Sequence, residues 1–212
     1  RLAPYVADVR HCDVLAEPVG TLVEPLAELL GRLDVRQHVP PIEVAVADNA
    51  TALVLRVLRT PTEDDRGKLR EFAARHEVRL YLQSGGLDSI AELTSGEPAG
   101  GASLCGPATT PLSYALPEFD LALEFAPTDF VQVNGAVNRA LVGLAVQLLR
   151  PTAGSSVLDL YCGLGNFTLA LARSAGRVVG VEGAASLVER ALHNARRNGV
   201  ENAEFHACDL SQ

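Results

Sequence analysis

The sequence predicts an α/β protein in which a doubly wound parallel sheet follows a smaller α+β domain. Residues 157–168 read as an apolar strand, a glycine turn and the start of a helix, and residues 178–182 form a second apolar strand that ends in a carboxylate. From residue 126 onward, strand patterns alternate with helix patterns, which is typical of parallel sheets with crossover helices. We therefore expect an α+β domain over residues 1–125 and the parallel-sheet domain over residues 126–212.

The composition is that of an ordinary globular protein. The 212 residues are 48% hydrophobic and 21% charged, and no apolar run approaches the roughly 18 residues that span a bilayer. The net charge of −8 argues against a broad nucleic-acid-binding surface on this stretch of chain. Scattered cysteines favour unpaired thiols and a cytoplasmic location. A start at Arg1, without an initiator Met, suggests a processed or truncated chain.

Residues 1–125 combine helix and strand patterns but indicate no chemistry by themselves. Leucines at helical spacing predict a helix over 17–33, and acidic residues after Pro61 predict the start of a second helix. Five apolar segments read as strands: residues 42–47, 52–58, 79–83, 112–116 and 121–125. The polar turn at Asp48 and Asn49 indicates that the first two strands form a hairpin.

The second domain begins with a strong helix pattern over residues 134–149, for which Asn134 is a suitable N-cap. The apolar residues of this helix share one face: Val137, Leu141, Leu144, Ala145 and Leu148. A buried strand from Val157 follows, and the alternation continues with helix 166–175, strand 178–182, helix 185–198 and strand 203–207. Three strands are about half of a doubly wound domain, so we expect the N-terminal half of its sheet.

Polar residues gather where these strands end, which is where ligands bind in such sheets. Gly163 and Gly165 let the backbone pass close to a ligand, and Glu182 follows Gly163 by 19 residues, a spacing that suits hydrogen bonds to ribose hydroxyls. Asp209 follows the third strand, where it can accept from an adenine amino group, and Tyr161 offers an aromatic face. A glycine turn alone is common after strands. Acidic residues at all three strand ends, Asp159 included, indicate a nucleoside site.

A dinucleotide site would instead need the G-x-G-x-x-G pattern, whose third glycine opens the helix to a pyrophosphate. Here Thr168 stands at the third glycine position, and Asn166 with Phe167 makes the first helical turn bulkier. That turn suits an amino-acid carboxylate or amine better than two phosphates. The pattern therefore favours S-adenosylmethionine over a nicotinamide dinucleotide.

Four segments together resemble the RNA (uracil-5)-methyltransferases: Asp129-Phe-Val-Gln-Val-Asn134, residues 157–169, Val179-Gly-Val-Glu-Gly183 and Asn194-Ala-Arg-Arg-Asn-Gly199. The resemblance implies a Rossmann-like methyltransferase domain that uses S-adenosylmethionine. His11-Cys-Asp-Val-Leu15 and the layout of residues 1–125 look like the central domain of the RumA (RlmD)-like branch, which modifies 23S ribosomal RNA.

The resemblance also implies individual roles. Beside Gly163 of the turn, the cofactor contacts would be Gln132, Tyr161, Asn166, Glu182 and Asp209. Tyr161 stands where the family more often has Phe, which preserves the aromatic face. The branch carries a four-iron, four-sulfur cluster, and Cys12 matches its fourth ligand. The other three cluster cysteines are expected before Arg1, while Cys105 matches nothing in the pattern.

In this family, a cysteine thiolate adds to carbon 6 of uracil, carbon 5 then takes the methyl group, and a Glu removes the carbon 5 proton. That Cys and that Glu are expected beyond Gln212, so neither Cys162 nor Cys208 is assigned the role and the isolated chain is expected to be inactive. The implied partner is 23S ribosomal RNA, bound by a monomer without membrane contact. A tRNA or another ribosomal uridine as target, and a non-catalytic S-adenosylmethionine-binding or RNA-interaction module, are the alternatives.

Overall fold

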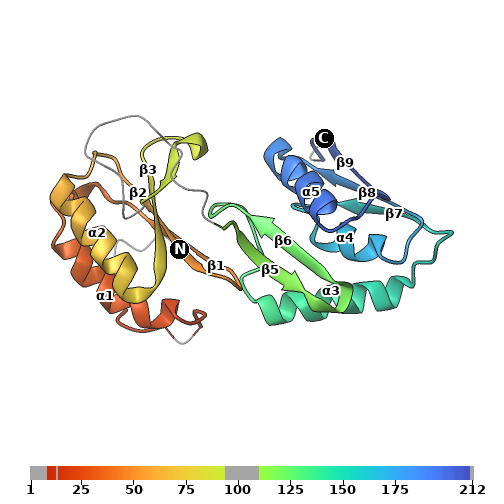
Figure 1. Cartoon of the computed structure of the whole chain (residues 1–212), viewed down its shortest axis with the longest axis horizontal. Helices are drawn as coiled ribbons and strands as arrows, with labels where there is room; N and C mark the ends of the chain where they lie inside the picture. Colours follow the sequence, from red (N-terminus) through yellow and green to blue (C-terminus); the bar gives the residue numbers. More distant parts are fainter. Residues whose placement is uncertain (1–8, 13, 94–109, 211–212) are drawn as a thin grey trace, which may run out of the picture. The chain divides into compact units, whose positions relative to one another are not determined.

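The computed structural model describes residues 9–12, 14–93 and 110–210, which divide into two compact units (Figure 1). Unit 1 comprises residues 1–46 and 50–109, and unit 2 comprises residues 47–49 and 110–212. The units therefore divide near residue 110, whereas the sequence pattern placed the boundary at 125. The difference arises because the hairpin over residues 112–125 packs against the helices of unit 2, as described below.

Unit 1 is a four-stranded sheet with two α-helices. Its strands are β1 (Ile42–Val46), β2 (Thr51–Arg56), β3 (Val78–Gln83) and β4 (Ile90–Glu92), and its helices are α1 (Val19–Gly31) and α2 (Glu63–His76), with short 3₁₀ turns at Arg36–His38 and Leu87–Ser89. The strand order is β1-β2-β3-β4, and only the β2–β3 pair is parallel, as expected for two strands joined through α2. Alternate residues of β2 and β3 share one core with leucines of both helices, so α1 and α2 cover the same face of this sheet.

The start of α2 shows how local sequence specifies this unit. Thr62 is the N-cap, and its hydroxyl accepts from the backbone N–H of Asp65 at 3.1 Å. Asp65 is fully buried, and its carboxylate accepts from the backbone N–H groups of Thr62 and Asp34 at 3.3 and 2.7 Å. This capping box satisfies N–H groups that the helix itself leaves unpaired.

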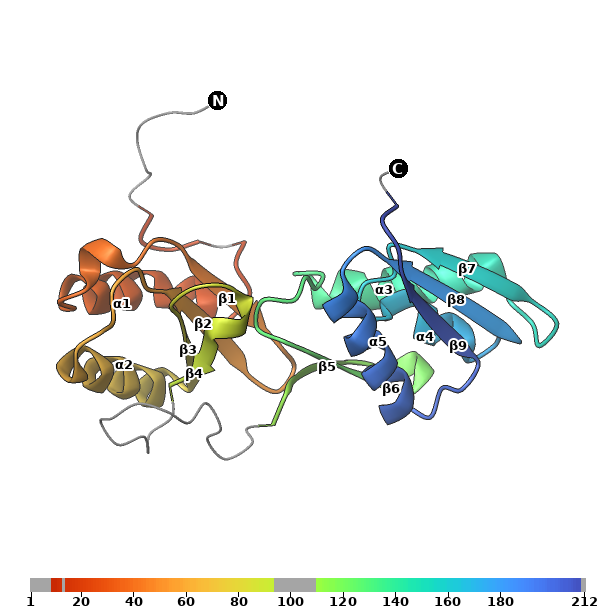
Figure 2. The same cartoon turned by 90° about the horizontal axis from the view of Figure 1, so that it is seen from above.

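Unit 2 combines a hairpin, three helices and a three-stranded parallel sheet. The hairpin strands are β5 (Leu112–Leu116) and β6 (Leu121–Phe125), with a 3₁₀ turn at Pro117–Phe119, and α3 (Gly135–Leu149) follows. The sheet is built from β7 (Ser156–Leu160), β8 (Arg177–Glu182) and β9 (Ala203–Ala207), connected by α4 (Asn166–Ala172) and α5 (Ala185–Arg197). Its strand order β7-β8-β9 is parallel throughout, and α4 and α5 pack on one face (Figure 2), which confirms the expected alternation.

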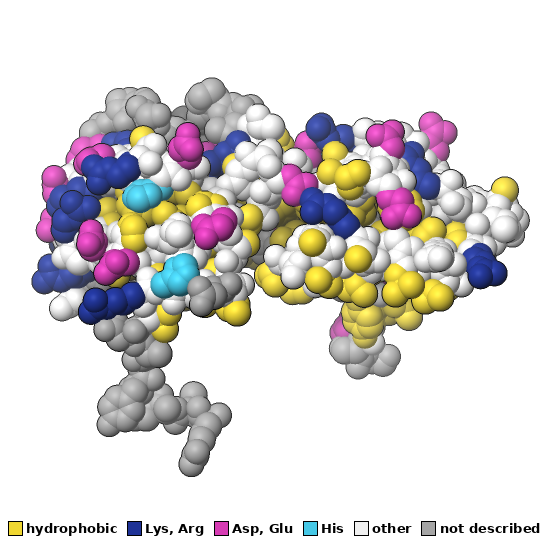
Figure 3. Space-filling model, turned by 90° about the horizontal axis from the view of Figure 1, so that it is seen from below, with side chains coloured by type: hydrophobic (Ala, Val, Ile, Leu, Met, Phe, Trp, Pro, Cys, Tyr) yellow, Lys and Arg dark blue, Asp and Glu magenta, His cyan; other side chains and the backbone are white. Residues whose placement is uncertain are grey.

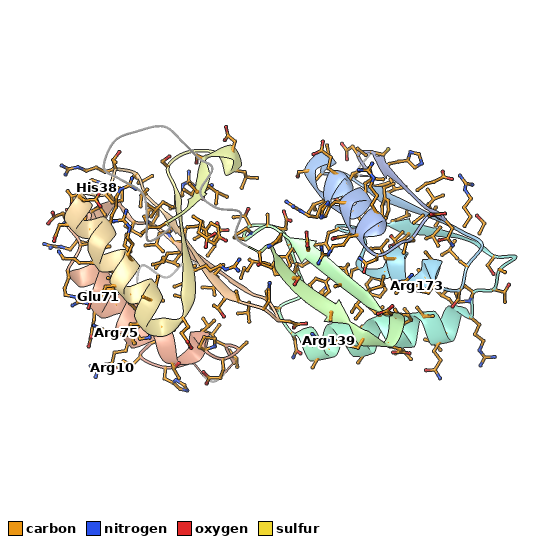
Figure 4. All side chains as sticks on the ribbon, in the orientation of Figure 1. Arg10, His38, Glu71, Arg75, Arg139 and Arg173 are labelled. Atoms are coloured by element: carbon orange, nitrogen blue, oxygen red, sulfur yellow. The ribbon has the colours of Figure 1, made fainter. Side chains whose placement is uncertain are left out.

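Polar side chains attach the β5–β6 hairpin to the rest of unit 2. Arg173, at the end of α4, donates to the carbonyl oxygens of Phe119 and Asp120 in the hairpin turn at 2.9 and 2.7 Å (Figure 4). Arg139 of α3 donates to the Ala115 carbonyl at 2.9 Å and to both carboxylate oxygens of Asp48 at 2.7 Å. These bonds explain why the hairpin belongs to unit 2.

The apolar side chains of α3 are more exposed than an amphipathic helix pattern predicts. Hydrophobic side chains gather on this side of unit 2 (Figure 3), where Val137, Leu141, Leu144 and Leu148 are 47 to 73% exposed. The strand β7 was expected to be buried, yet Leu158 and Leu160 are 61 and 50% exposed. They alternate with Asp159, which bonds to Thr168 of α4, so they lie on the sheet face away from that helix. No helix in the described ranges is long and apolar enough to cross a membrane.

Candidate functional site

The carboxyl ends of β7, β8 and β9 meet at one edge of the parallel sheet, and three of the residues singled out in the sequence lie there. Tyr161 directly follows β7, Glu182 is the last residue of β8, and Asp209 follows β9. Bonds link the three ends: the Tyr161 hydroxyl donates to the Leu210 carbonyl at 3.3 Å, and the Cys208 N–H donates to the Glu182 carbonyl at 2.9 Å. The strand register thus brings together residues that are far apart in the sequence.

The glycine turn between β7 and α4 needs backbone angles that most residues avoid. Gly163 and Gly165 have φ values of +55° and +96°, where a side chain would be strained. Tyr161 has a φ of +59° and is 69% exposed, so a bulky aromatic residue is held in a left-handed conformation at the sheet edge. Such a conformation costs of order 1–3 kcal/mol and is concentrated at functional sites.

Glu182 organises the edge through both of its carboxylate oxygens. Oε2 accepts from the Gly163 N–H at 3.0 Å, which ties the glycine turn to the end of β8. Oε1 accepts from the Ala184 N–H, also at 3.0 Å. A carboxylate offers about four lone-pair sites. Glu182 can therefore hold the turn and still accept hydrogen bonds from the hydroxyls of a ribose.

A polar pair of one half-buried and one buried side chain lies beneath the turn. The Thr168 hydroxyl donates to the Asp159 carboxylate at 2.6 Å, and Thr168 is fully buried. Burial raises the pKa of Asp159, and the hydrogen bonds from Thr168 oppose that shift. The pair braces α4 against β7, so Asp159 acts beneath the turn as a structural acceptor.

The thiol of Cys162 is unsuited to nucleophilic chemistry. Its side chain is buried, and burial together with the nearby carboxylates of Asp159 and Glu182 raises the pKa of Cys162 to about 12. The thiolate is the reactive form of cysteine. This environment supports the expectation that Cys162 has no nucleophilic role.

Asn166, the first residue of α4, directs its side chain toward other elements of unit 2. Its Oδ1 accepts from the Tyr114 hydroxyl at 2.9 Å and from Asn138 Nδ2 at 3.0 Å, and its Nδ2 donates to Asn138 Oδ1 at 2.9 Å. Burial raises the pKa of Tyr114, which favours the protonated hydroxyl that donates here. The Asn166 amide therefore has a bracing role that its motif did not indicate, and one amide hydrogen remains for a ligand.

Gln132 is exposed and lies on the segment between β6 and α3. Its assignment rests on the resemblance alone. Sequence reasoning did not identify a function for Asn138, which is 4% exposed, or for Asn194, which is 0% exposed. Their position in apolar helical stripes could have indicated a bonding role, because a buried amide side chain must find hydrogen-bond partners.

Cys12 lies in unit 1 as a half-buried free thiol. Next to it, the His11 ring lies 3.2 Å from the Gly20 carbonyl oxygen. Within residues 9–12, 14–93 and 110–210, no group of three or more His, Cys, Asp or Glu side chains could hold a metal ion. The described residues therefore do not form the donor set of an iron–sulfur cluster by themselves, and Cys105 falls outside them.

Sequence comparison relates this chain to enzymes that methylate uracil in RNA. The family model described as tRNA (Uracil-5-)-methyltransferase matches residues 116–210. A 23S rRNA (uracil(1939)-C(5))-methyltransferase RlmD of Burkholderia pseudomallei (strain 1710b) is 47% identical over 204 residues, which are 96% of this chain and 41% of that protein. The protein of the same name from Aromatoleum aromaticum is 44% identical over 211 residues, 99% of this chain and 46% of the relative. The chain thus spans less than half the length of these curated relatives.

Structural comparison supports the fold. The tRNA (uracil-54, C5)-methyltransferase of Pyrococcus abyssi, solved in complex with S-adenosyl-L-homocysteine, matches 97% of this chain and 50% of its own. The TM-score is 0.65 and the sequence identity 17%. At this identity the likeness shows the fold alone, and it confirms the predicted α/β class with a Rossmann-like domain.

Proposed function

Because this chain belongs to the RNA (uracil-5-)-methyltransferase family, we propose that it carries the methyl-donor site of an enzyme that methylates carbon 5 of a uridine in 23S ribosomal RNA. The observation that carries the proposal is the sheet edge at which Tyr161, Glu182 and Asp209 meet. The activity is proposed for the intact protein, since the chain spans 41 to 46% of the curated relatives.

The residues at this edge suit S-adenosylmethionine. Glu182 would accept from the ribose hydroxyls, Asp209 from the adenine amino group, and Tyr161 would lie against the nucleoside with its exposed ring. Gly163 would let the backbone approach the ligand, because the space that a Cβ would occupy there is open. Its positive φ would also strain any other residue at this position. Gln132 and the remaining hydrogen of the Asn166 amide complete the proposed contacts. The bound cofactor supplies an electrophilic methyl group, and these residues bind and orient it.

Methyl transfer to RNA tests the function of the intact protein. The protein is incubated with radiolabelled S-adenosylmethionine and with transcripts of 23S ribosomal RNA or of tRNA, and the modified nucleoside is identified by mass spectrometry. We expect 5-methyluridine in the 23S transcript. Methylation of the tRNA alone would assign the other substrate class, and binding of cofactor without transfer to either RNA would favour a non-catalytic module.

Glu182→Ala tests the cofactor site. Removal of the carboxylate deletes the proposed ribose acceptor and frees the Gly163 N–H, so we expect affinity for S-adenosylhomocysteine to fall about 10- to 100-fold, as for loss of hydrogen bonds to a charged group. Glu189→Ala, which removes an exposed carboxylate from α5, is the matched control and should bind normally. Unchanged affinity of the Glu182 variant by calorimetry would contradict the ribose assignment.

The remaining roles are proposed for the intact protein as a whole. Residues 1–125 would form its central domain, of which the β5–β6 hairpin packs within unit 2, and residues 126–212 would open the methyltransferase domain. Cys12, a free and half-buried thiol, would be the fourth ligand of a four-iron, four-sulfur cluster whose other three cysteines come from outside this chain. Iron and sulfide analysis of the intact protein, compared with its Cys12→Ser variant, tests this role. A ribosomal RNA substrate implies a cytoplasmic enzyme, and we propose that it acts as a monomer.

A further inference from the structure

We propose that Asn194 of α5 is a positioning residue that holds the glycine turn in the shape the methyl donor requires. The inference rests on the proposed function, and it assigns a role to the Asn194-Ala-Arg-Arg-Asn-Gly199 motif, whose chemistry the sequence did not indicate. Asn194 would not touch the cofactor. It would act through the backbone of the turn.

The Asn194 amide is fully buried and uses both ends. Its Oδ1 accepts from the Glu124 N–H at 2.9 Å, and its Nδ2 donates to the Glu124 carbonyl at 3.1 Å, so the side chain pairs with the edge of β6 as a neighbouring strand would. The same Nδ2 also donates to the carbonyl oxygen of Leu164 at 3.2 Å. Leu164 lies between Gly163 and Gly165, at the centre of the glycine turn. One amide thus joins α5, β6 and the turn.

Glu182 holds a second backbone group of the turn, because it accepts from the Gly163 N–H. Asn194 and Glu182 therefore fix opposite backbone groups of adjacent residues, one a carbonyl and one an N–H. Glycine residues leave the turn few steric constraints of its own, so these two bonds select among the conformations it can adopt. If the binding-competent shape becomes less populated, the apparent affinity for the cofactor falls in proportion.

Asn198, the C-cap residue of α5 and one helical turn beyond Asn194, supplies a matched control. It pairs with β6 in the same way: Oδ1 accepts from the Ala122 N–H at 2.8 Å, and Nδ2 donates to the Ala122 carbonyl at 2.9 Å. Its remaining bond goes to the Asn194 carbonyl oxygen, at 2.7 Å. Asn198 therefore docks β6 without contacting the turn. The two asparagines differ in the link to Leu164.

The experiment compares Asn194→Ala with Asn198→Ala in the intact protein, with S-adenosylhomocysteine as the probe in calorimetry and amide hydrogen exchange as a second readout. We expect Asn194→Ala to bind about tenfold more weakly than Asn198→Ala at comparable thermal stability, because a buried carbonyl has lost its donor. Exchange at Gly163 and Gly165 should accelerate in the Asn194 variant alone. With saturating cofactor, the rate of RNA methylation should recover.

Each outcome decides the inference. Equal affinities for the two variants would overturn it, as would unchanged exchange in the turn. Asn194→Asp keeps the size and the acceptor but loses the amide donor. If Asn194→Ala does not fold, Asn194→Asp is compared with Asn198→Ala in its place. Failure of both Asn194 variants to fold, with Asn198→Ala folded, would make Asn194 a structural brace and also overturn the proposal. Absence of binding by the wild-type protein would refute the proposed function instead.

Discussion

Replacement of Gly180 by alanine tests how closely the sheet packs beneath the glycine turn. Gly180 lies in β8, between Asp159 of β7 and Phe205 of β9 in the strand register. An added Cβ would stand 2.8 and 3.1 Å from two atoms of the Phe205 ring and 2.9 Å from the Cys162 sulfur. Real Cβ atoms essentially never come within 3.0 Å of another atom, as two of these three distances would require, and both neighbours are buried, with 8 and 5% exposure. The ring and the sulfur must therefore move.

Overpacking of this kind costs about 1–3 kcal/mol, and the lower backbone entropy of alanine in the unfolded chain offsets about 0.4–1 kcal/mol. We expect Gly180→Ala to lower the free energy of unfolding by about 1–2 kcal/mol, or Tm by about 5–15 °C for a unit of this size. Thermal unfolding followed by circular dichroism measures the shift. Gly183→Ala is the control, because the nearest atom to its added Cβ is 3.9 Å away, so only the unfolded-chain effect acts and Tm should rise by about 2–8 °C.

A double-mutant cycle identifies the cause. Phe205→Leu removes ring atoms that the new Cβ would meet, so the double variant should be more stable than the sum of the two single effects predicts, by about 1 kcal/mol. Strict additivity of the two substitutions would refute the steric argument. A Tm for Gly180→Ala equal to that of Gly183→Ala would refute the packing itself.

Three further results are expected. Since burial raises the pKa of Cys162 to about 12, its thiolate fraction at pH 8 is about 10⁻⁴. A thiol reagent should therefore modify the exposed Cys208 long before Cys162. Equal modification rates by mass spectrometry would contradict this. Burial also raises the pKa of Asp159 above 3.8, so the protonated carboxyl stabilises the fold below that pH, and this stabilisation is lost as pH rises through the folded-state pKa. In urea titrations, the stability of wild type relative to Asp159→Asn should therefore fall from pH 4 upward. A constant difference would be inconsistent with the raised pKa. Asn134→Ala deletes the side-chain acceptor that holds the Val137 N–H at 3.0 Å, and denaturant unfolding should show a loss of about 1 kcal/mol, with no loss meaning that the cap is dispensable.

Local sequence patterns were sufficient for most elements because they report local physics. The helix over α3 and its Asn134 cap, the strands of the parallel sheet and the glycine turn were all predicted from residue spacing, and the structure confirms them. The short strand β4 escaped prediction, since three residues carry too little periodic pattern. The α2 capping box was not predicted either, although Thr62 and Asp65 are only three positions apart.

Hydrogen bonds between residues far apart in the sequence were harder to predict. Asn166 was predicted as a cofactor contact, but its partners Asn138 and Tyr114 lie 28 and 52 residues away, and no spacing rule connects them. Asn194 reaches Glu124 across 70 residues. Such bonds exist only after the hairpin, the helices and the sheet have been placed against each other.

The sequence by itself determined that this protein has a parallel α/β sheet with acidic residues at its strand ends, and that a nucleoside cofactor is favoured there. Those properties depend on neighbours in the chain: apolar alternation, glycine conformational freedom and helix caps. The tertiary structure decided what the polar side chains do. It showed that Glu182 holds the Gly163 N–H, that Asp159 is paired with Thr168 beneath the turn, and that the apolar stripe of α3 lies largely exposed. The burial and the hydrogen-bond partners of a side chain depend on how helices and strands pack together, so they are determined only by the tertiary structure.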